Sequence, residues 1–113
     1  MKLLFVCSRN RFRSPTAEAV FSGYENVEAL SAGVSPDAEN PVSADLIEWA
    51  DLVFAMERAH RRKLQHRFGS LLKRKQIVVL DIPDKFGFMD AELVRMLKEK
   101  VTPHLSGRKS AEK

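Results

Sequence analysis

The chain has 113 residues, of which 44% are hydrophobic and 30% are charged. That composition excludes a disordered or fibrous protein, and the length allows one domain with room for one site. Nineteen Lys and Arg residues against fifteen Asp and Glu residues give a net charge of +4, which favours anionic partners without identifying the anion.

The first half of the chain predicts two strands and two helices. A continuous apolar run at residues 3–6 is typical of a strand that is covered on both faces. Residues 27–32 predict a less buried strand at a sheet edge, because Glu28 and Ser31 interrupt the apolar run. The apolar faces of the two helices have the 3.6-residue period: Ala17, Val20, Phe21 and Tyr24 in the first, and Leu46, Ile47 and Trp49 in a short second one.

The second half repeats this alternation. Residues 52–56 and 77–80 are continuous apolar runs, which we interpret as two more covered strands. The helical faces comprise Leu64, Phe68, Leu71 and Leu72, and then Leu93, Val94, Leu97, Val101 and Leu105. This order predicts an α/β fold, a three-layer α-β-α sandwich with a four-stranded parallel sheet and flavodoxin-like, doubly wound topology. We expect one domain over residues 1–105 and a polar C-terminal tail over residues 106–113.

The connection after the first strand contains the candidate site. Pro15 suits the first turn of the following helix, so the preceding residues should form a tight loop that ends on a helix N-terminus. Such a terminus binds phosphate through unpaired N–H groups and a partial positive charge, and ligands of doubly wound sheets bind beside this first connection. The predicted phosphate-binding residues are Ser8, Arg9, Asn10, Arg11, Phe12, Arg13 and Ser14.

Cys7 and Arg13 bracket this loop with the spacing C-x5-R. Electropositive surroundings favour the thiolate of a cysteine, which is its nucleophilic form. An arginine can close over an anion with two parallel hydrogen bonds, a geometry that lysine cannot supply. The spacing alone is a weak pattern, and its position between a buried strand and a helix with Pro15 at its start makes it specific. The alternative is a buried apolar cysteine beside a solvated arginine.

Further segments give the chain a family resemblance. Residues 4–7, Asn10 and residues 13–18 resemble the signature of the low-molecular-weight protein tyrosine phosphatases. Three later segments are also similar to the family, in the family's order. Residues 31–33 resemble its segment after the second strand, and residues 51–60 resemble its third strand and the start of the next helix. Residues 82–86 resemble its late Asp-Pro-Tyr segment.

The resemblance implies a phosphomonoester hydrolase, here a protein tyrosine phosphatase, that needs no metal or cofactor. Cys7 would attack phosphorus and form a phosphocysteine, while Arg13 and the loop amides hold the oxygens. Water would then release inorganic phosphate. By the same resemblance, Asn10 would hold the shape of the loop with a left-handed backbone, and Ser14 would hydrogen-bond the thiolate. The substrate would be a phosphorylated protein or a small phosphomonoester.

The leaving group also needs a proton donor. The resemblance assigns this role of general acid to Asp84, because its spacing to Pro83 and Phe86 matches the family. Asp81 is the rival candidate, three residues earlier and nearer the end of the predicted strand. It is equally well explained as a turn residue.

Four positions depart from the family pattern. Arg9 stands where the family usually has glycine, and Phe12 stands where it usually has a second cysteine. Arg9 would crowd the loop, bind a second anionic group, or point to solvent. The Pro-Tyr that usually follows the acid is replaced by Lys85 and Phe86, which would alter the mouth of the pocket.

Other functions fit parts of the sequence. A cysteine phosphocarrier would share the first strand and loop, but Arg13, Ser14, Pro15 and the Asp84 segment argue against it. An arsenate reductase of this fold would need several cysteines, and this chain has one. A phosphate- or polyanion-binding protein would use the basic residues between 58 and 75, yet most such runs are solvated helix faces, so nucleic acid is not the expected partner. These residues are Arg58, Arg61, Arg62, Lys63, Arg67, Lys73, Arg74 and Lys75.

Cellular location and metal binding follow from what the chain lacks. One cysteine excludes an intrachain disulfide and favours a reducing compartment. The apolar run at residues 3–6 is too short for a secretory signal, and no stretch approaches a membrane span, so we expect a cytoplasmic protein with no membrane partner. His60 and His66 are interpreted as surface residues and not as metal ligands, because their spacing puts them on different helix faces.

Overall fold

In the computed structural model, which describes residues 1–105, four parallel strands form one sheet in the order β2-β1-β3-β4. The strands are β1 (Lys2–Cys7), β2 (Glu28–Gly33), β3 (Leu52–Ala55) and β4 (Gln76–Val79). The helices are α1 (Arg13–Phe21), α2 (Ala44–Trp49), α3 (Arg58–Leu72) and α4 (Ala91–Val101), followed by the 3-10 helix η1 (Thr102–His104). The predicted order of elements and the parallel α/β fold are confirmed; the predicted tail at residues 106–113 lies outside the described residues.

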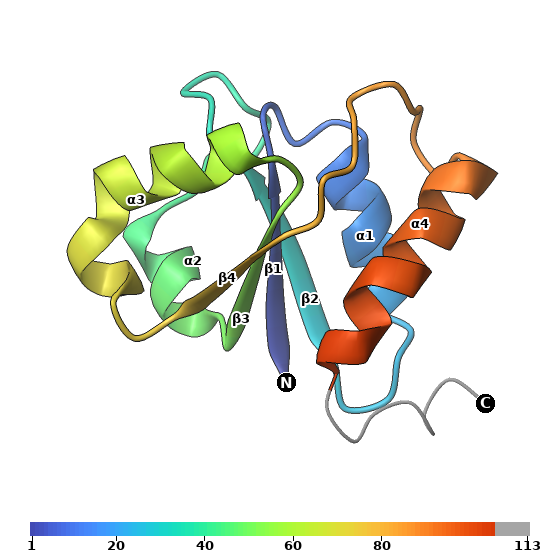
Figure 1. Ribbon diagram of the computed structural model, residues 1–113, viewed down its shortest axis with the longest axis horizontal. Helices are drawn as coiled ribbons and strands as arrows, with labels where there is room; N and C mark the ends of the chain where they lie inside the picture. Colours follow the sequence, from blue (N-terminus) through green and yellow to red (C-terminus); the bar gives the residue numbers. More distant parts are fainter. Residues whose placement is uncertain (106–113) are drawn as a thin grey trace.

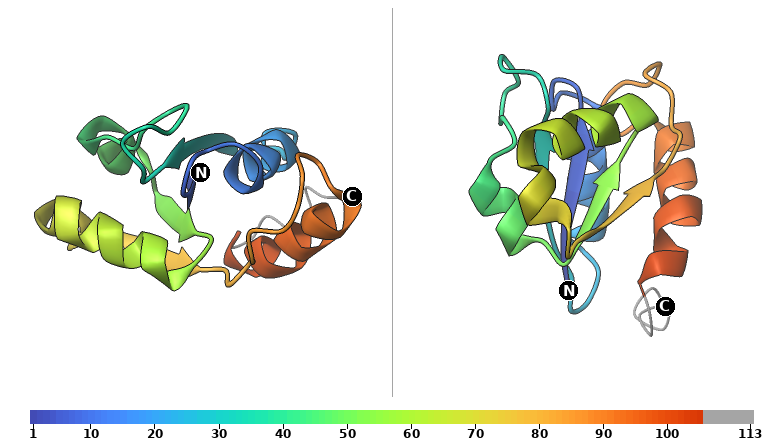
Figure 2. Two further views of the ribbon diagram at one scale, coloured as in Figure 1. Left: turned by 90° about the horizontal axis from the view of Figure 1, so that it is seen from above. Right: turned by 60° about the vertical axis from the view of Figure 1, so that its left-hand side comes forward.

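The sheet lies between two layers of helices. Helices α1 and α4 cover one face, and α2 and α3 cover the other (Figures 1 and 2). Side chains of the central strand β1 alternate between these layers: Leu3, Phe5 and Cys7 belong to the core under α1 and α4, whereas Leu4 and Val6 belong to the other. This alternation places the sulfur of Cys7 on the same side of the sheet as α1.

The two edge strands differ from the central ones in burial. The edge position predicted for β2 is confirmed. The prediction that residues 77–80 are covered on both faces is wrong for β4, whose residues are half-buried or exposed. The reason is that β4 is the other edge strand and pairs with β3 alone. Helix α1 also ends earlier than predicted, and Tyr24 lies in the turn after it with its ring packed on Phe21.

The carboxyl ends of all four strands meet at one edge of the sheet, at the top of Figure 1. Cys7 pairs with Gly33 in β2, and the strand ends of β3 and β4 also pair in register. The loops that follow β1, β2 and β4 therefore gather around one place, where the candidate site lies. No helix among residues 1–105 is long and apolar enough to cross a membrane.

Candidate active site

The loop between β1 and α1 is fixed by backbone hydrogen bonds to the segment after β2. The carbonyls of Cys7, Ser8 and Arg9 accept from the amides of residues 34, 35 and 39 at 2.9, 2.9 and 3.2 Å. The amides of residues 8–12 donate to no acceptor within the described part of the chain. These N–H groups, together with the start of α1, remain available to bind an anion.

Gly33 permits this close contact between the two segments. A Cβ atom at this position would lie 2.6 Å from the Ser8 carbonyl oxygen and 2.6 Å from the Cβ of Ala38. Neither contact is tolerated by real side chains, and the first is to backbone that cannot move without displacing the loop. A side chain at residue 33 would therefore push the loop out of position.

A chain of buried hydrogen bonds lies beneath the loop. The amide nitrogen Nδ2 of Asn10 donates to the hydroxyls of Ser14 and Ser31, both at 2.9 Å. The Ser31 hydroxyl donates to Glu18 at 2.6 Å. The Ser14 hydroxyl accepts from Asn10, so its own hydrogen can point at the sulfur of Cys7, 2.9 Å away, or at the more distant carbonyl of Ala32, 3.5 Å away. Asn10 has the left-handed backbone that the resemblance implied, with φ of 60°.

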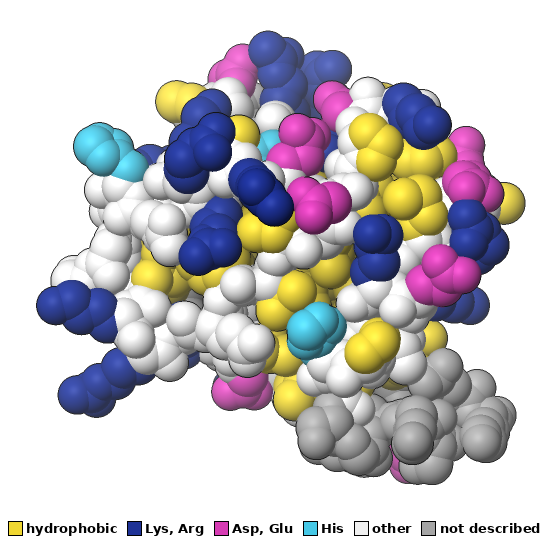
Figure 3. Space-filling view, in the orientation of Figure 1, with side chains coloured by type: hydrophobic (Ala, Val, Ile, Leu, Met, Phe, Trp, Pro, Cys, Tyr) yellow, Lys and Arg dark blue, Asp and Glu magenta, His cyan; other side chains and the backbone are white. Residues whose placement is uncertain are grey.

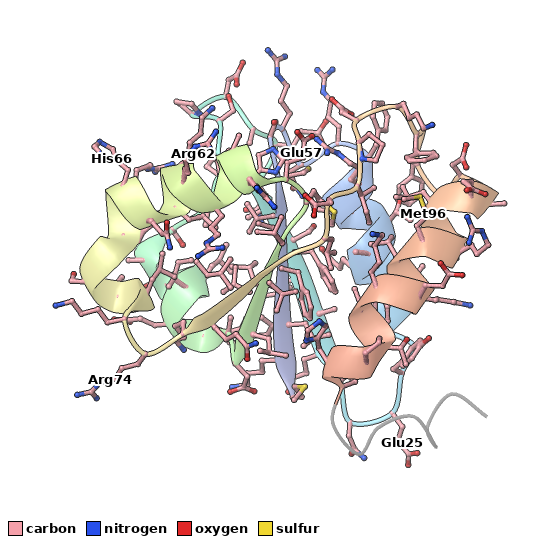
Figure 4. The ribbon with its side chains drawn as sticks, in the orientation of Figure 1. Glu25, Glu57, Arg62, His66, Arg74 and Met96 are labelled. Carbon is pink, nitrogen blue, oxygen red and sulfur yellow. The ribbon has the colours of Figure 1, made fainter. Side chains whose placement is uncertain are left out.

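The guanidinium of Arg13 is buried and held from two sides. Its Nη1 donates to Glu57 at 2.5 Å and to the carbonyl of Ile82 at 2.7 Å. Its Nε lies 3.7 Å from a carboxylate oxygen of Asp84. Figure 4 shows Glu57 at the start of α3, beside the end of the sheet where the loops meet. These contacts fix the orientation of Arg13, and its second terminal nitrogen makes no hydrogen bond to residues 1–105.

A pocket of about 330 Å³ opens above the loop. Its lining residues are Cys7, Ser8, Arg9, Arg11, Phe12, Arg13 and Asp84. Of the predicted phosphate-binding residues, Asn10 and Ser14 lie beneath the loop and support it. Asp81 does not line the pocket; it has φ of 55° and lines a separate surface hollow.

Known proteins of similar sequence and fold are phosphatases. No protein-family model matches the chain. The protein-arginine-phosphatase of Bacillus subtilis (strain 168) is 33% identical over 61% of this chain and 64% of the relative, so the match spans less than two thirds of that protein. A YwlE arginine phosphatase, solved as a cysteine-to-serine mutant with a phosphorylated active-site serine, is 26% identical over 98% of this chain and 99% of its own, with a TM-score of 0.75. A low-molecular-weight protein tyrosine phosphatase from T. tengcongensis is 25% identical over 93% of this chain and 99% of its own, with a TM-score of 0.73. The predicted resemblance to the low-molecular-weight protein tyrosine phosphatases is thus confirmed in sequence and in fold.

His60 supports the loop between β1 and α1 from its position in α3. The backbone amide of Glu57 donates to its Nδ1 at 3.1 Å, so the hydrogen is on Nε2, which lies 2.9 Å from the hydroxyl of Ser8 and donates to it. Burial, and next the charge of Arg13, lower the pKa of His60 to about 4. The ring is therefore neutral at physiological pH.

The prediction that His60 is a surface residue is wrong, because its side chain is only 3% exposed. The reason is its position as the third residue of α3, where it closes a capping box with Glu57 and faces the loop. The spacing Glu57-x-x-His60 is the sequence signal that could have indicated this. His66, six residues later, is exposed as predicted. Within residues 1–105, no group of three or more His, Cys, Asp or Glu side chains could hold a metal ion.

Proposed function

We propose that this protein is a phosphatase of phosphorylated proteins that acts through a phosphocysteine on Cys7, with residues 1–105 as its single catalytic domain. The observation that carries the proposal is the sulfur of Cys7 at a pocket shared with Arg13, with the Ser14 hydroxyl 2.9 Å from the sulfur. The phosphorylated serine of the similar arginine phosphatase supports the nucleophile. A thiolate enzyme with no second cysteine suits a reducing compartment, and we infer the cytoplasm.

In the first step, the thiolate of Cys7 attacks phosphorus in line with the leaving group. A sulfur–phosphorus bond forms while the bond from phosphorus to the substrate breaks. Arg13 and the free amides of residues 8–12 bind the three other oxygens, whose charge they stabilise. Asp84, in its protonated form, gives its proton to the leaving oxygen.

In the second step, water attacks the phosphocysteine. Asp84, now a carboxylate, accepts a proton from this water, the sulfur–phosphorus bond breaks, and inorganic phosphate leaves. The hydroxyl of Ser14 donates to the departing thiolate of Cys7 and makes it a better leaving group. The buried network through Asn10 keeps that hydroxyl in place, since its Nδ2 occupies the acceptor side of Ser14.

Phosphotyrosine is the first candidate substrate. Phe12 is 44% exposed and lines the pocket, where its ring offers an apolar face to the phenol. Arg9 and Arg11 line the same pocket against one carboxylate, that of Asp84, and this positive surplus disfavours a cationic leaving group. Phosphoarginine is the second candidate, favoured by the 33% identical relative, which is a protein-arginine-phosphatase. The exposed carboxylate of Asp84 could then bind the guanidinium.

The test is phosphate release from a phosphotyrosine peptide and from a phosphoarginine peptide of the same sequence, with a chelator present. We expect Cys7→Ser to lose at least about 10⁴-fold of the rate, as removal of a catalytic nucleophile does. Undiminished activity in Cys7→Ser would end the proposal. A larger kcat/KM for the phosphoarginine peptide would replace the first substrate with the second; the phosphocysteine on Cys7 would stay, but the bond broken would be phosphorus–nitrogen and the leaving atom a nitrogen.

A further inference from the structure

Two arginines at the mouth of the pocket, Arg9 and Arg11, have few ion pairs with carboxylates of the described residues. Arg11 lies 3.8 Å from Glu39, and both side chains are more than half exposed, at 57% and 69%. Such an exposed pair contributes at most about 1 kcal/mol and exchanges partners readily. Arg9 forms no ion pair within residues 1–105. The pKa of Asp37 is lowered, first by a hydrogen bond from Ser35 and next by the charge of Arg9. Both arginines are therefore free to bind an anionic group of a substrate.

A second hollow lies along α3. It is a groove of about 430 Å³ between α3 and the segment after β2. Its lining is apolar at Val34, Pro36 and Ala59 and basic at Arg62, Lys63, His66 and Arg67. Figure 4 shows Arg62 and His66 on the upper side of α3, the side that also carries Glu57. Figure 3 shows Lys and Arg side chains over this end of α3.

Two backbone segments, joined by hydrogen bonds, lie between the groove and the pocket. Ser8 lines the pocket, and its carbonyl accepts from the amide of Ser35, which lies between Val34 and Pro36 in the groove lining. The amide of Val34 donates to the carbonyl of Cys7, and Arg67 donates to the carbonyl of Val34 at 3.2 Å. A peptide whose phosphorylated residue enters the pocket can therefore pass over Ser8 and reach the groove with its next residues.

We propose that this groove binds an acidic segment of the phosphoprotein substrate, next to the phosphorylated residue. The inference rests on the proposed phosphatase function and adds a substrate class to it. Arg62 and Lys63 form no ion pair with any described residue, so a carboxylate from the substrate meets no internal competitor there. The apolar part of the lining suits peptide side chains, and no Phe, Tyr or Trp ring lines the groove to stack on the bases of a nucleic acid.

The test compares two phosphopeptides that differ only in the residues flanking the phosphorylated one, three glutamates in one and three glutamines in the other. The wild-type protein should hydrolyse the acidic peptide with a kcat/KM about tenfold higher at low salt, as two or three exposed ion pairs allow. The ratio should approach one near 0.5 M salt, roughly, where screening is strong. In the double variant Arg62→Ala, Lys63→Ala the ratio should fall to about two or less.

The matched control is the double variant Lys73→Ala, Arg74→Ala. It removes the same charge from the far end of the basic stretch, where both side chains are exposed and neither lines the groove. This control should keep the wild-type ratio. An equal loss of the ratio in both double variants would mean that the whole stretch attracts polyanions, and would overturn the proposal. So would inhibition by a single-stranded nucleic acid that is lost equally in both variants.

The failure of this inference and the failure of the proposed function give different results. Hydrolysis of both peptides at equal rates by the wild-type protein would overturn the acidic-segment proposal and leave the phosphatase standing. No hydrolysis of para-nitrophenyl phosphate or of either peptide, by a protein that folds and binds inorganic phosphate, would overturn the phosphatase itself.

Discussion

The base and the mouth of the pocket are built differently. At the base, Cys7, Asn10 and Ser14 are buried and joined by hydrogen bonds of 2.9 Å. At the mouth, Arg11 and Asp84 are mostly exposed and are placed by ion pairs of 3.8 and 3.7 Å. The difference separates two tasks. The base fixes the positions of the groups proposed to react, whereas side chains at the mouth can be substituted with little loss of stability.

Arg13 lies between the base and the mouth, and we expect its substitution to lower activity more than any other substitution except that of Cys7. In Arg13→Lys, the ammonium cannot bind two phosphate oxygens side by side while also reaching Glu57 and Ile82. We expect kcat/KM to fall about 10³-fold and affinity for inorganic phosphate to fall as well. Arg11→Lys, the matched change at the mouth, should cost at most about tenfold. Similar losses of kcat/KM in both variants would show that the base of the pocket tolerates a change of side chain as well as the mouth does.

Substitutions of Asp84 and Asp81 test whether the general acid is the aspartate that lines the mouth of the pocket. Asn is the substitution of choice, because it keeps the shape of both side chains and tolerates the φ of 55° at Asp81. Asp84→Asn should lower kcat about 10²-fold for a substrate with a poor leaving group, and less for para-nitrophenyl phosphate. Asp81→Asn should stay within about twofold. If Asp81→Asn is the more damaged variant, Asp81 is the acid.

Gly33 tests the fit between the loop and the segment after β2. Gly33→Ala places a methyl group 2.6 Å from the Ser8 carbonyl, and we expect a loss of about 2 kcal/mol in the free energy of unfolding. Activity should fall with it, because the loop moves. Gly69→Ala is the control: a Cβ there meets nothing within 4 Å, and alanine favours the helix. Urea unfolding of both variants measures the difference, and equal stability would contradict the contact.

His60 predicts a small effect of pH on stability. Its pKa is lowered from 6.5 to about 4 in the folded protein, so between these values the unfolded chain binds more protons. Stability from this group is complete above about pH 6.5 and is lost as the pH falls toward about 4. From about pH 7 to about pH 5.5 the loss should be about 1 kcal/mol. His60→Gln should flatten this slope and the exposed His66→Gln should not; an unchanged slope in His60→Gln would assign it to other groups.

The sequence predicted the parts of this molecule that depend on local pattern. The apolar run of β1 and the position of Pro15 were enough to place Cys7 at the end of a buried strand and Arg13 at the start of a helix. The prediction of an edge strand at residues 27–32 followed from two polar residues. Burial of β4 was overestimated, because an apolar run does not tell how many neighbouring strands cover it.

What the sequence did not predict depends on contacts between distant residues. Arg13 binds partners 44 and 69 residues later, Glu57 and Ile82. His60 reaches Ser8 across 52 residues. Neither residue type nor spacing alone indicates such contacts, and a histidine in a run of basic residues is normally exposed. The capping box at the start of α3 was the one local signal, and it becomes informative only when the loop is known to pack there.

Glu57 belongs to two structures at once, since it caps α3 and binds Arg13. A ligand that orders the first turn of α3 therefore also steadies the guanidinium in the pocket. By thermodynamic reciprocity, phosphate in the pocket must in turn favour that ligand by the same factor. The first turn of α3 thus contacts both the phosphate pocket and the groove, because Glu57 binds Arg13 and Ala59 lines the groove.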